Sequence, residues 1–195
     1  MMFEMLNPEY RFSALAKITP EWMRKHHYRA LLMDIDNTLL PRNSYVVPEK
    51  NIAWLMRMQK QGIALVLASN NGGERVEAIK KQLERNGLSI PILTWAGKPF
   101  PRAYDGALRL LESSVASDGD VFADLAKHPS RILATGDQLF TDVLGAHWYH
   151  LPAAWLRPLS KNDFIGTKVL RLLEQWITGR LAEKGLLPEE DLETK

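Results

Sequence analysis

The 195-residue chain carries 25 basic and 23 acidic side chains, for a net charge of +2, and 46% of its residues are hydrophobic. This composition is typical of one globular domain with a sizeable core, and it excludes a general nucleic-acid-binding protein, which would carry a strong basic excess. The absence of cysteine excludes disulfides and thiolate metal sites, and no apolar run approaches the ~20 residues of a membrane span. The N-terminus also lacks the pattern of a signal peptide, so we expect a cytoplasmic protein.

Residues 1–29 form an N-terminal extension without a clear hydrophobic repeat. Thr19 is a suitable N-cap, Pro20 a suitable first helical residue and Glu21 an acidic first-turn residue, which together predict a helix over 19–27. This helix ends in a basic stretch, 24–29, that also contains a tyrosine. A solvated helix end is the favoured interpretation of this stretch, and a binding surface is the alternative.

The apolar run 30–33 predicts a buried strand, and two carboxylates, Asp34 and Asp36, follow it directly. Where a strand leaves the sheet, both side chains can face the crevice in which open parallel α/β sheets bind their ligands. Paired carboxylates repel each other unless a cation lies between them, and ligand sets made only of oxygen favour Mg²⁺. The sequence therefore predicts a magnesium site at the end of this strand.

Strands and helices alternate along the rest of the chain. After a stretch suited to a hairpin flap, 41–47, the predicted strands are 63–68, 91–95, 131–135 and 153–156. The predicted helices are 48–62, 74–86, 101–111 and 162–187, and 113–130 is expected to be a surface connection with one helical turn near 121–127. Such alternation predicts a three-layer α/β/α domain over 30–187, built on a mostly parallel sheet of five strands with right-handed crossovers.

Polar residues follow each later strand of the predicted sheet. Ser69 and Asn70 begin a loop with two glycines after the second strand, and the backbone N–H groups of such a loop can bind an anion. Lys98 lies in a proline-stiffened loop after the third strand. Asp137 follows the fourth strand, and Asp142 falls in the first turn of the next helix. Because the carboxyl ends of parallel strands meet at one edge, we expect these side chains to converge.

Each of these residues also has a plainer interpretation. Lys98 could be a surface lysine, although its loop position favours the site, and Asp142 could simply complement a helix dipole. His147 and His150 are three positions apart but have no third ligand nearby in the sequence, so we interpret them as ordinary residues at a helix end.

The helix predicted over 162–187 has an apolar face that we expect to pack on the sheet. The members of this face are Val169, Leu172, Leu173, Trp176, Ile177 and Leu181. Basic residues outnumber acidic ones between 157 and 184. The tail that follows, 188–195, is expected to fray.

The order of the motifs resembles that of haloacid dehalogenase (HAD) superfamily phosphatases over about 30–156. In detail it is similar to subfamily IIIA, the YqeG-type branch related to mitochondrial phosphatidylglycerophosphate phosphatases. The segments that carry the resemblance are 33–40 (MDIDNTLL), 68–71 (ASNN), 97–99 (GKP) and 136–145 (GDQLFTDVLG). The resemblance implies a HAD-like Rossmannoid fold, and the short spacings between the motifs leave no room for a cap domain.

The resemblance also implies a role for each motif residue. Asp34 would be the nucleophile that forms an aspartyl-phosphate, and Asp36 the general acid/base. The implied phosphate-binding residues are Ser69, Asn70 and Lys98. The implied Mg²⁺ ligands are Asp34, the carbonyl of Asp36, and Asp137, with Asp142 and Thr38 in support.

An open, capless site suits a phosphate carried on something large, and the resemblance points to a lipid such as phosphatidylglycerophosphate. We therefore expect a phosphatase of phospholipid metabolism that makes peripheral contact with the inner face of the membrane through its basic segments, 24–29 and 157–184. A phosphatase of a soluble metabolite or a phosphoprotein is the alternative. A non-catalytic phosphoacceptor domain is less favoured, because it has no use for Asp36, and a degenerate binding module would lack at least one of these groups.

Overall fold

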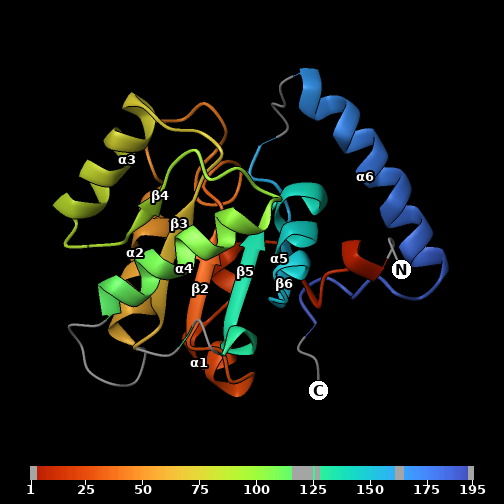
Figure 1. The fold of residues 1–195 in the computed structure, drawn as a ribbon, viewed down its shortest axis with the longest axis horizontal. Helices are drawn as coiled ribbons and strands as arrows, with labels where there is room; N and C mark the ends of the chain where they lie inside the picture. The colour runs from red at the N-terminus through yellow and green to blue at the C-terminus, as the bar shows by residue number, and fades with distance from the viewer. Residues whose placement is uncertain (1–3, 116–124, 126–127, 161–164, 193–195) are drawn as a thin grey trace.

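The computed structural model describes residues 4–115, 125, 128–160 and 165–192, and it is built around one parallel sheet (Figure 1). The strands are β1 (Tyr10–Phe12), β2 (Ala30–Met33), β3 (Ala64–Ala68), β4 (Ile92–Leu93), β5 (Ile132–Gly136) and β6 (Ala153–Leu156). The helices are α1 (Pro20–Lys25), α2 (Glu49–Lys60), α3 (Glu74–Arg85), α4 (Pro101–Val115), α5 (Leu144–Trp148) and α6 (Ile165–Glu183). Short 3-10 turns cover Glu4–Leu6, Leu15–Lys17 and Pro129–Arg131, and a π-helical turn covers Leu139–Val143.

The sheet has six strands in the order β1-β6-β5-β2-β3-β4, so the expectation of five strands was wrong. The additional strand, β1, comes from the N-terminal extension and pairs in parallel with β6, with Tyr10 opposite Ala154 and Phe12 opposite Leu156. A strand of three residues is too short to show an alternation of polar and apolar positions, so β1 could not be predicted from the sequence.

Helices cover both faces of the sheet and form two separate cores. Successive side chains of a strand point to opposite faces, so Leu31 and Met33 of β2 pack with α1, α2 and α3. Ala30 and Leu32 pack on the other face, with α4, α5 and α6. Because β2 is buried on both sides, its sequence is a continuous apolar run rather than an alternating one.

Most of the predicted helices are present, with small changes at their ends. Thr19 accepts a hydrogen bond from the backbone of Trp22 and caps α1, as predicted. α4 continues to Val115, further than expected, and the turn proposed near 121–127 lies outside the described residues except for Leu125. The segment 41–47 forms turns rather than a hairpin.

The packing face of α6 differs from the predicted one. Leu172 and Trp176 are 68% and 52% exposed, whereas Glu174, Ile177 and Leu181 are buried against the second core. α6 lies at the edge of the molecule, beyond α5 (Figure 1). The prediction was correct for Ile177 and Leu181 but wrong for Leu172, Leu173 and Trp176, because the buried stripe contains a carboxylate, which a hydrophobic pattern assigns to the surface. The side chain of Val169 is outside the described residues.

The part of the tail that the structure describes is bound to the edge strand rather than frayed. Asp191 accepts hydrogen bonds from the backbone N–H and the hydroxyl of Ser13, at 2.9 and 2.6 Å. Glu190 forms an ion pair with Arg157. Among the helices that the structure describes, none combines the length and the hydropathy that crossing a membrane requires.

Candidate active site

A cavity of about 190 Å³ opens at the carboxyl edge of the sheet, where the loops after β2, β3, β4 and β5 meet. This is the edge at which parallel α/β sheets bind ligands. The residues that line the cavity are Asp34, Asp36, Arg42, Asn70, Asn71, Lys98, Gln138, Thr141 and Asp142. The structure therefore brings five of the eight site residues predicted from the sequence to one cavity.

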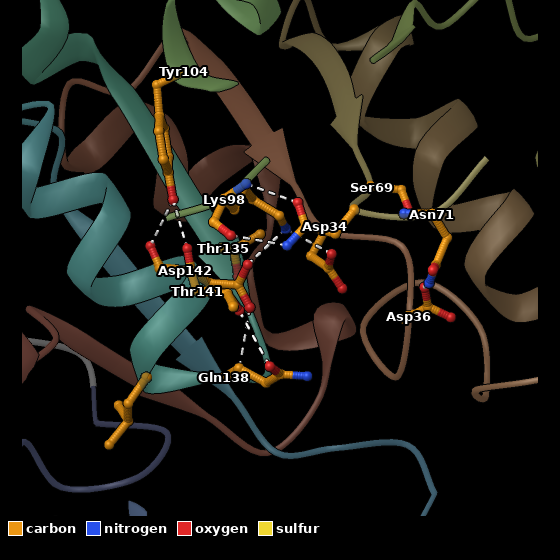
Figure 2. A network of polar contacts seen from close by, with 12 residues as sticks. Asp34, Asp36, Ser69, Asn71, Lys98, Tyr104, Thr135, Gln138, Thr141 and Asp142 are labelled. Atoms are coloured by element: carbon orange, nitrogen blue, oxygen red, sulfur yellow. Dashed lines mark hydrogen bonds and ion pairs between the residues drawn. The ribbon is translucent and has the colours of Figure 1, made fainter. Parts of the chain in front are cut away.

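At the centre of this cavity a buried lysine bridges two buried carboxylates (Figure 2). Lys98 Nζ lies 2.6 Å from Asp34 Oδ1 and 2.7 Å from Asp142 Oδ1. Burial opposes the charge on Lys98, but Asp142 and Asp34 outweigh it and raise the lysine pKa, so the ammonium ion persists at every physiological pH. Burial raises the pKa of Asp34 to about 7, against the effect of Lys98. Positive charge beside Asp34, such as that of Lys98, therefore favours its ionised form.

The position of Lys98 is set by Asn70. The side-chain oxygen of Asn70 accepts a hydrogen bond from the backbone N–H of Lys98 at 2.7 Å, and its amide donates to the Lys98 carbonyl at 2.9 Å. Ser69 is fully buried, and its hydroxyl oxygen accepts a hydrogen bond from the backbone N–H of Asn71 at 3.0 Å. Ser69 therefore shapes the loop and does not line the cavity, whereas Asn70 does both.

The loop after β5 carries two acidic residues in a compact arrangement. A Cβ at Gly136 would lie 2.2 Å from the carboxylate of Asp142, so glycine at this position allows the carboxylate to fold back over the strand end. Asp142 Oδ2 accepts a hydrogen bond from the backbone N–H of Gln138 at 3.1 Å. Asp142 thus binds its own loop with one oxygen and Lys98 with the other.

Two helices hold this loop from outside. From α4, the hydroxyl of Tyr104 donates to the backbone carbonyls of Thr141 and Asp142, at 2.9 and 3.1 Å. From α6, buried Glu174 accepts a hydrogen bond from the backbone N–H of Leu139 at 2.7 Å. Neither contact could be predicted from the sequence, because each joins segments far apart in the chain.

Three buried carboxylates, two of which line this cavity, could hold a metal ion. Asp34, Asp137 and Asp142 each place an oxygen within 4.8 Å of the others. Three carboxylates around one lysine leave two negative charges uncompensated, and hard oxygen donors suit Mg²⁺. These residues fit the predicted cofactor, with Asp142 placed as a direct ligand candidate rather than only a supporting residue. The side chain of Asp36 is not part of this cluster.

Asp36 instead turns toward the helix that follows β3. One carboxylate oxygen accepts a hydrogen bond from the Asn71 amide at 2.7 Å, and the other lies 2.8 Å from Arg75 Nη2. Figure 2 shows Asp36 beside Asn71, apart from the group formed by Lys98, Asp34 and Asp142. The two aspartates of the first motif therefore have separate partners.

The turn after Asp36 is stabilised by Asn37 rather than by Thr38. Asn37 has a left-handed backbone (φ 58°), which asparagine tolerates better than most residues. Its side-chain oxygen accepts hydrogen bonds from the Arg42 backbone at 3.0 Å and the Ser160 hydroxyl at 2.6 Å. The Thr38 hydroxyl is buried and makes no hydrogen bond to the described part of the chain.

Comparison with known proteins agrees with this geometry. The sequence profile of a family described as mitochondrial PGP phosphatase matches residues 3–158. The chain belongs to this family. A probable phosphatase, YqeG, from Bacillus subtilis (strain 168) is 27% identical over 191 residues, covering 98% of this chain and 100% of that protein.

Solved structures of similar fold include a haloacid dehalogenase-like hydrolase from Brucella suis 1330, with 16% identity and a TM-score of 0.46 over 75% of this chain and 93% of that one. A hypothetical protein from Xanthomonas campestris has 15% identity and a TM-score of 0.45 over 89% and 97% of the two chains.

Membership of the PGP phosphatase family makes this chain a phosphatase, as the sequence predicted. Its site combines a carboxylate at a strand end, a buried ammonium ion that faces this carboxylate, and a further carboxylate beside it. Phosphoryl transfer requires a nucleophile, positive charge on the transferring oxygens and a proton donor for the leaving group. The residues of this cavity can supply each of these functions.

Proposed function

We propose that this phosphatase hydrolyses a lipid phosphomonoester, such as phosphatidylglycerophosphate, through a phosphorylated Asp34 in a Mg²⁺-dependent reaction. The observation that carries the mechanism is the bridge from Lys98 to Asp34 and Asp142 in a buried cluster. The lipid substrate is supported by the family and by exposed apolar residues on the loops that carry Arg42 and Lys98.

In this mechanism an oxygen of Asp34 attacks phosphorus, and the bond from phosphorus to the leaving oxygen breaks. Asp36 gives a proton to that oxygen, then removes a proton from a water molecule that attacks the aspartyl-phosphate and releases phosphate. Lys98 stabilises the negative charge on the transferring group. Mg²⁺, held by Asp34, Asp137 and Asp142, would supply further positive charge.

Exposed apolar side chains lie on the two loops that also supply the cavity-lining residues Arg42 and Lys98, and a lipid substrate would require such side chains near the site. Tyr45 and Val46, from 41–47, are 55% and 64% exposed, and Phe100, two residues after Lys98, is 55% exposed. Trp95, on the loop before Lys98, is 70% exposed and has a left-handed backbone (φ 50°), an unusual conformation for a bulky residue. Strained positions of this kind are often functional.

We propose that these side chains, rather than the basic stretch 24–29, contact the inner face of the cytoplasmic membrane. The Arg29 carbonyl accepts a hydrogen bond from the backbone of Ala64, at the start of β3, so this stretch lies at the amino edge of the sheet, opposite the cavity. Because the two lie at opposite edges of the sheet, one membrane surface could not bind this stretch and at the same time supply a lipid substrate to the cavity. Aromatic side chains favour the membrane–water interface, which suits Trp95 and Phe100.

The chemical step is tested with purified protein, Mg²⁺ and phosphatidylglycerophosphate in detergent, beside sugar phosphates, nucleotides and a phosphopeptide. Asp34→Asn should abolish turnover, because a neutral amide attacks phosphorus poorly, and Asp36→Asn should lose ~10²–10⁴-fold. Asp105→Asn, on the exposed side of α4, is the matched control and should keep full activity. Turnover by Asp34→Asn at the wild-type rate would exclude the mechanism.

Membrane contact is tested by co-sedimentation with phosphatidylglycerol vesicles. Trp95→Ala should weaken binding, whereas Trp148→Ala, which removes an exposed tryptophan of α5, should not. Equal binding by both variants, together with faster turnover of a soluble phosphate than of the lipid, would favour the alternative of a soluble substrate.

A further inference from the structure

The cavity has a second basic lining residue, for which the family resemblance implies no role. This residue is Arg42, which lies eight positions after Asp34, in the segment 41–47 and outside all four motifs. The segment is at the surface, with Tyr45 and Val46 exposed, but Arg42 Nε is buried. The side chain of Arg42 therefore turns inward, toward the cavity that it lines.

The backbone around Arg42 is held at both ends of its segment. The side-chain oxygen of Asn37 accepts a hydrogen bond from the Arg42 N–H at 3.0 Å. At the other end, the Gln82 amide of α3 donates to the Val47 carbonyl at 2.9 Å, and its oxygen accepts from the Val47 N–H at 2.8 Å. A residue held in this way is positioned before the substrate binds, so little ordering entropy is lost on binding.

The charges around the cavity leave a place for a cation beside the substrate. The lining carboxylates are Asp34, Asp36 and Asp142, and the lining cations are Lys98 and Arg42. Lys98 lies between Asp34 and Asp142, so two carboxylates already balance its charge. A phosphomonoester brings about two further negative charges into this space. Arg42 is the lining cation outside the bridge, and it can offset them.

We propose that Arg42 is a further catalytic residue, whose guanidinium group binds the non-bridging oxygens of the transferring phosphoryl group. Guanidinium groups bind phosphate through two parallel N–H donors, which a lysine cannot reproduce. The cavity has a volume of about 190 Å³, so a phosphoryl group inside it lies close to every wall. This role rests on the proposed function and adds to the positive charge that Lys98 and Mg²⁺ would supply.

The test compares two substrates that share the phosphoryl group but differ in the leaving group. These are p-nitrophenyl phosphate and phosphatidylglycerophosphate in detergent. kcat and KM are measured with Mg²⁺ for the wild type, Arg42→Gln, Arg42→Lys and the control Arg85→Gln, which changes an exposed arginine at the end of α3. Inorganic phosphate, the common product, is titrated as an inhibitor and in melting curves, which also show which variants fold.

Arg42→Gln should lower kcat/KM by roughly 10–100-fold, the usual effect of losing hydrogen bonds to a charged group, and by the same factor for both substrates. The inhibition constant of phosphate should rise by a similar factor, and phosphate should raise Tm less than it does in the wild type. Arg42→Lys should recover only part of each loss. Arg85→Gln should match the wild type throughout.

An Arg42→Gln variant with unchanged kcat/KM and unchanged inhibition by phosphate would overturn the proposal and leave the phosphatase reaction intact. A loss confined to phosphatidylglycerophosphate would also overturn it, because Arg42 would then bind the leaving group. Failure of the proposed function appears differently. In that case the wild type would turn over neither substrate, or Asp34→Asn would keep the wild-type rate, and the role of Arg42 would be rejected as well.

Discussion

The side-chain amide of Asn70 forms hydrogen bonds with both the N–H and the carbonyl of Lys98, 28 positions further along the chain. This pair of contacts joins the loop after β3 to the loop after β4. It places the lysine backbone so that the ammonium group reaches Asp34 and Asp142 at the same time. Asn70 therefore acts in this site chiefly by positioning the lysine.

Lys98→Ala should lower kcat by roughly 10²–10³-fold, the usual loss on removal of a group that stabilises transition-state charge. Asn70→Ala should lower kcat by at most roughly 30-fold, since it removes two hydrogen bonds worth about 1 kcal/mol each. The double variant should be little worse than Lys98→Ala, because both changes act on the same ammonium group. Steady-state kinetics of the three variants checks this, and strictly multiplicative losses would show that Asn70 acts independently.

Mg²⁺ should stabilise the protein if the carboxylate cluster binds it. At a hundredfold excess over Kd, binding to the folded state adds about 2.7 kcal/mol, which is roughly 5–10 °C in Tm for a chain of this size. Asp137→Asn should lose most of this shift, and the exposed-site variant Asp105→Asn should keep it. Melting curves in Mg²⁺ and in EDTA provide the measurement, and an equal shift in Asp137→Asn would place the ion elsewhere.

Glu174→Ala should impair both stability and turnover. It leaves the backbone N–H of Leu139 without its acceptor, at a cost of about 1–3 kcal/mol, and loosens the loop that carries Asp137 and Asp142. Glu174→Gln retains a side-chain oxygen and should recover much of the loss. Glu183→Ala, on the exposed side of α6, should behave as wild type in melting and kinetic assays. If Glu174→Ala also melts and turns over substrate like the wild type, then α6 does not support the site.

His147 should make stability depend on pH. Burial lowers its pKa, but the hydrogen bond and charge of Glu9 outweigh burial, so the net pKa is raised above 6.5. The folded state therefore binds the proton more tightly than the unfolded state, and this contribution is complete below pH 6.5 and lost as pH rises through the folded value. The pair lies beside a cavity of about 630 Å³ that shares no lining residue with the catalytic one.

The measurement is urea unfolding of the wild type and His147→Gln between pH 5.5 and 9. The free energy of unfolding of the wild type should exceed that of His147→Gln by more at pH 6 than at pH 9. Glu9→Gln should reduce this difference, because it removes the charge that raises the histidine pKa. A difference in unfolding free energy that stays constant from pH 5.5 to 9 would contradict the raised pKa of His147.

The sequence predicted the central strands around the site and their parallel arrangement, because each of these strands is a short apolar run followed directly by a polar motif. Asp34, Asn70, Lys98 and Asp142 were all expected at one edge, and the topology alone brings them there. Parallel strands share a direction, so residues at their carboxyl ends converge whatever the details of packing.

The contacts that orient these groups could not be predicted. Arg75 and Glu174 belong to no recognisable motif. Arg75 contacts Asp36 and Glu174 contacts Leu139, and both partners are more than 30 positions away in the chain, beyond the reach of a local sequence pattern. The buried face of α6 was predicted only in part for the same reason. Glu174 is buried because its carboxylate accepts a hydrogen bond from the backbone N–H of Leu139, which the sequence of the helix does not reveal. β1 was missed because three residues carry too little pattern.

The pairing of β1 with β6 has a consequence for the order of events on the ribosome. Tyr10 leaves the exit tunnel long before Ala154, its partner in the sheet, has been synthesised. At ordinary elongation rates this delay is on the order of ten seconds. During that time β1 has no neighbour, whereas β2 and β3 can already associate. The edge of the sheet, with Asp191 bound over Ser13, is therefore completed only after nearly all of the nascent chain has emerged.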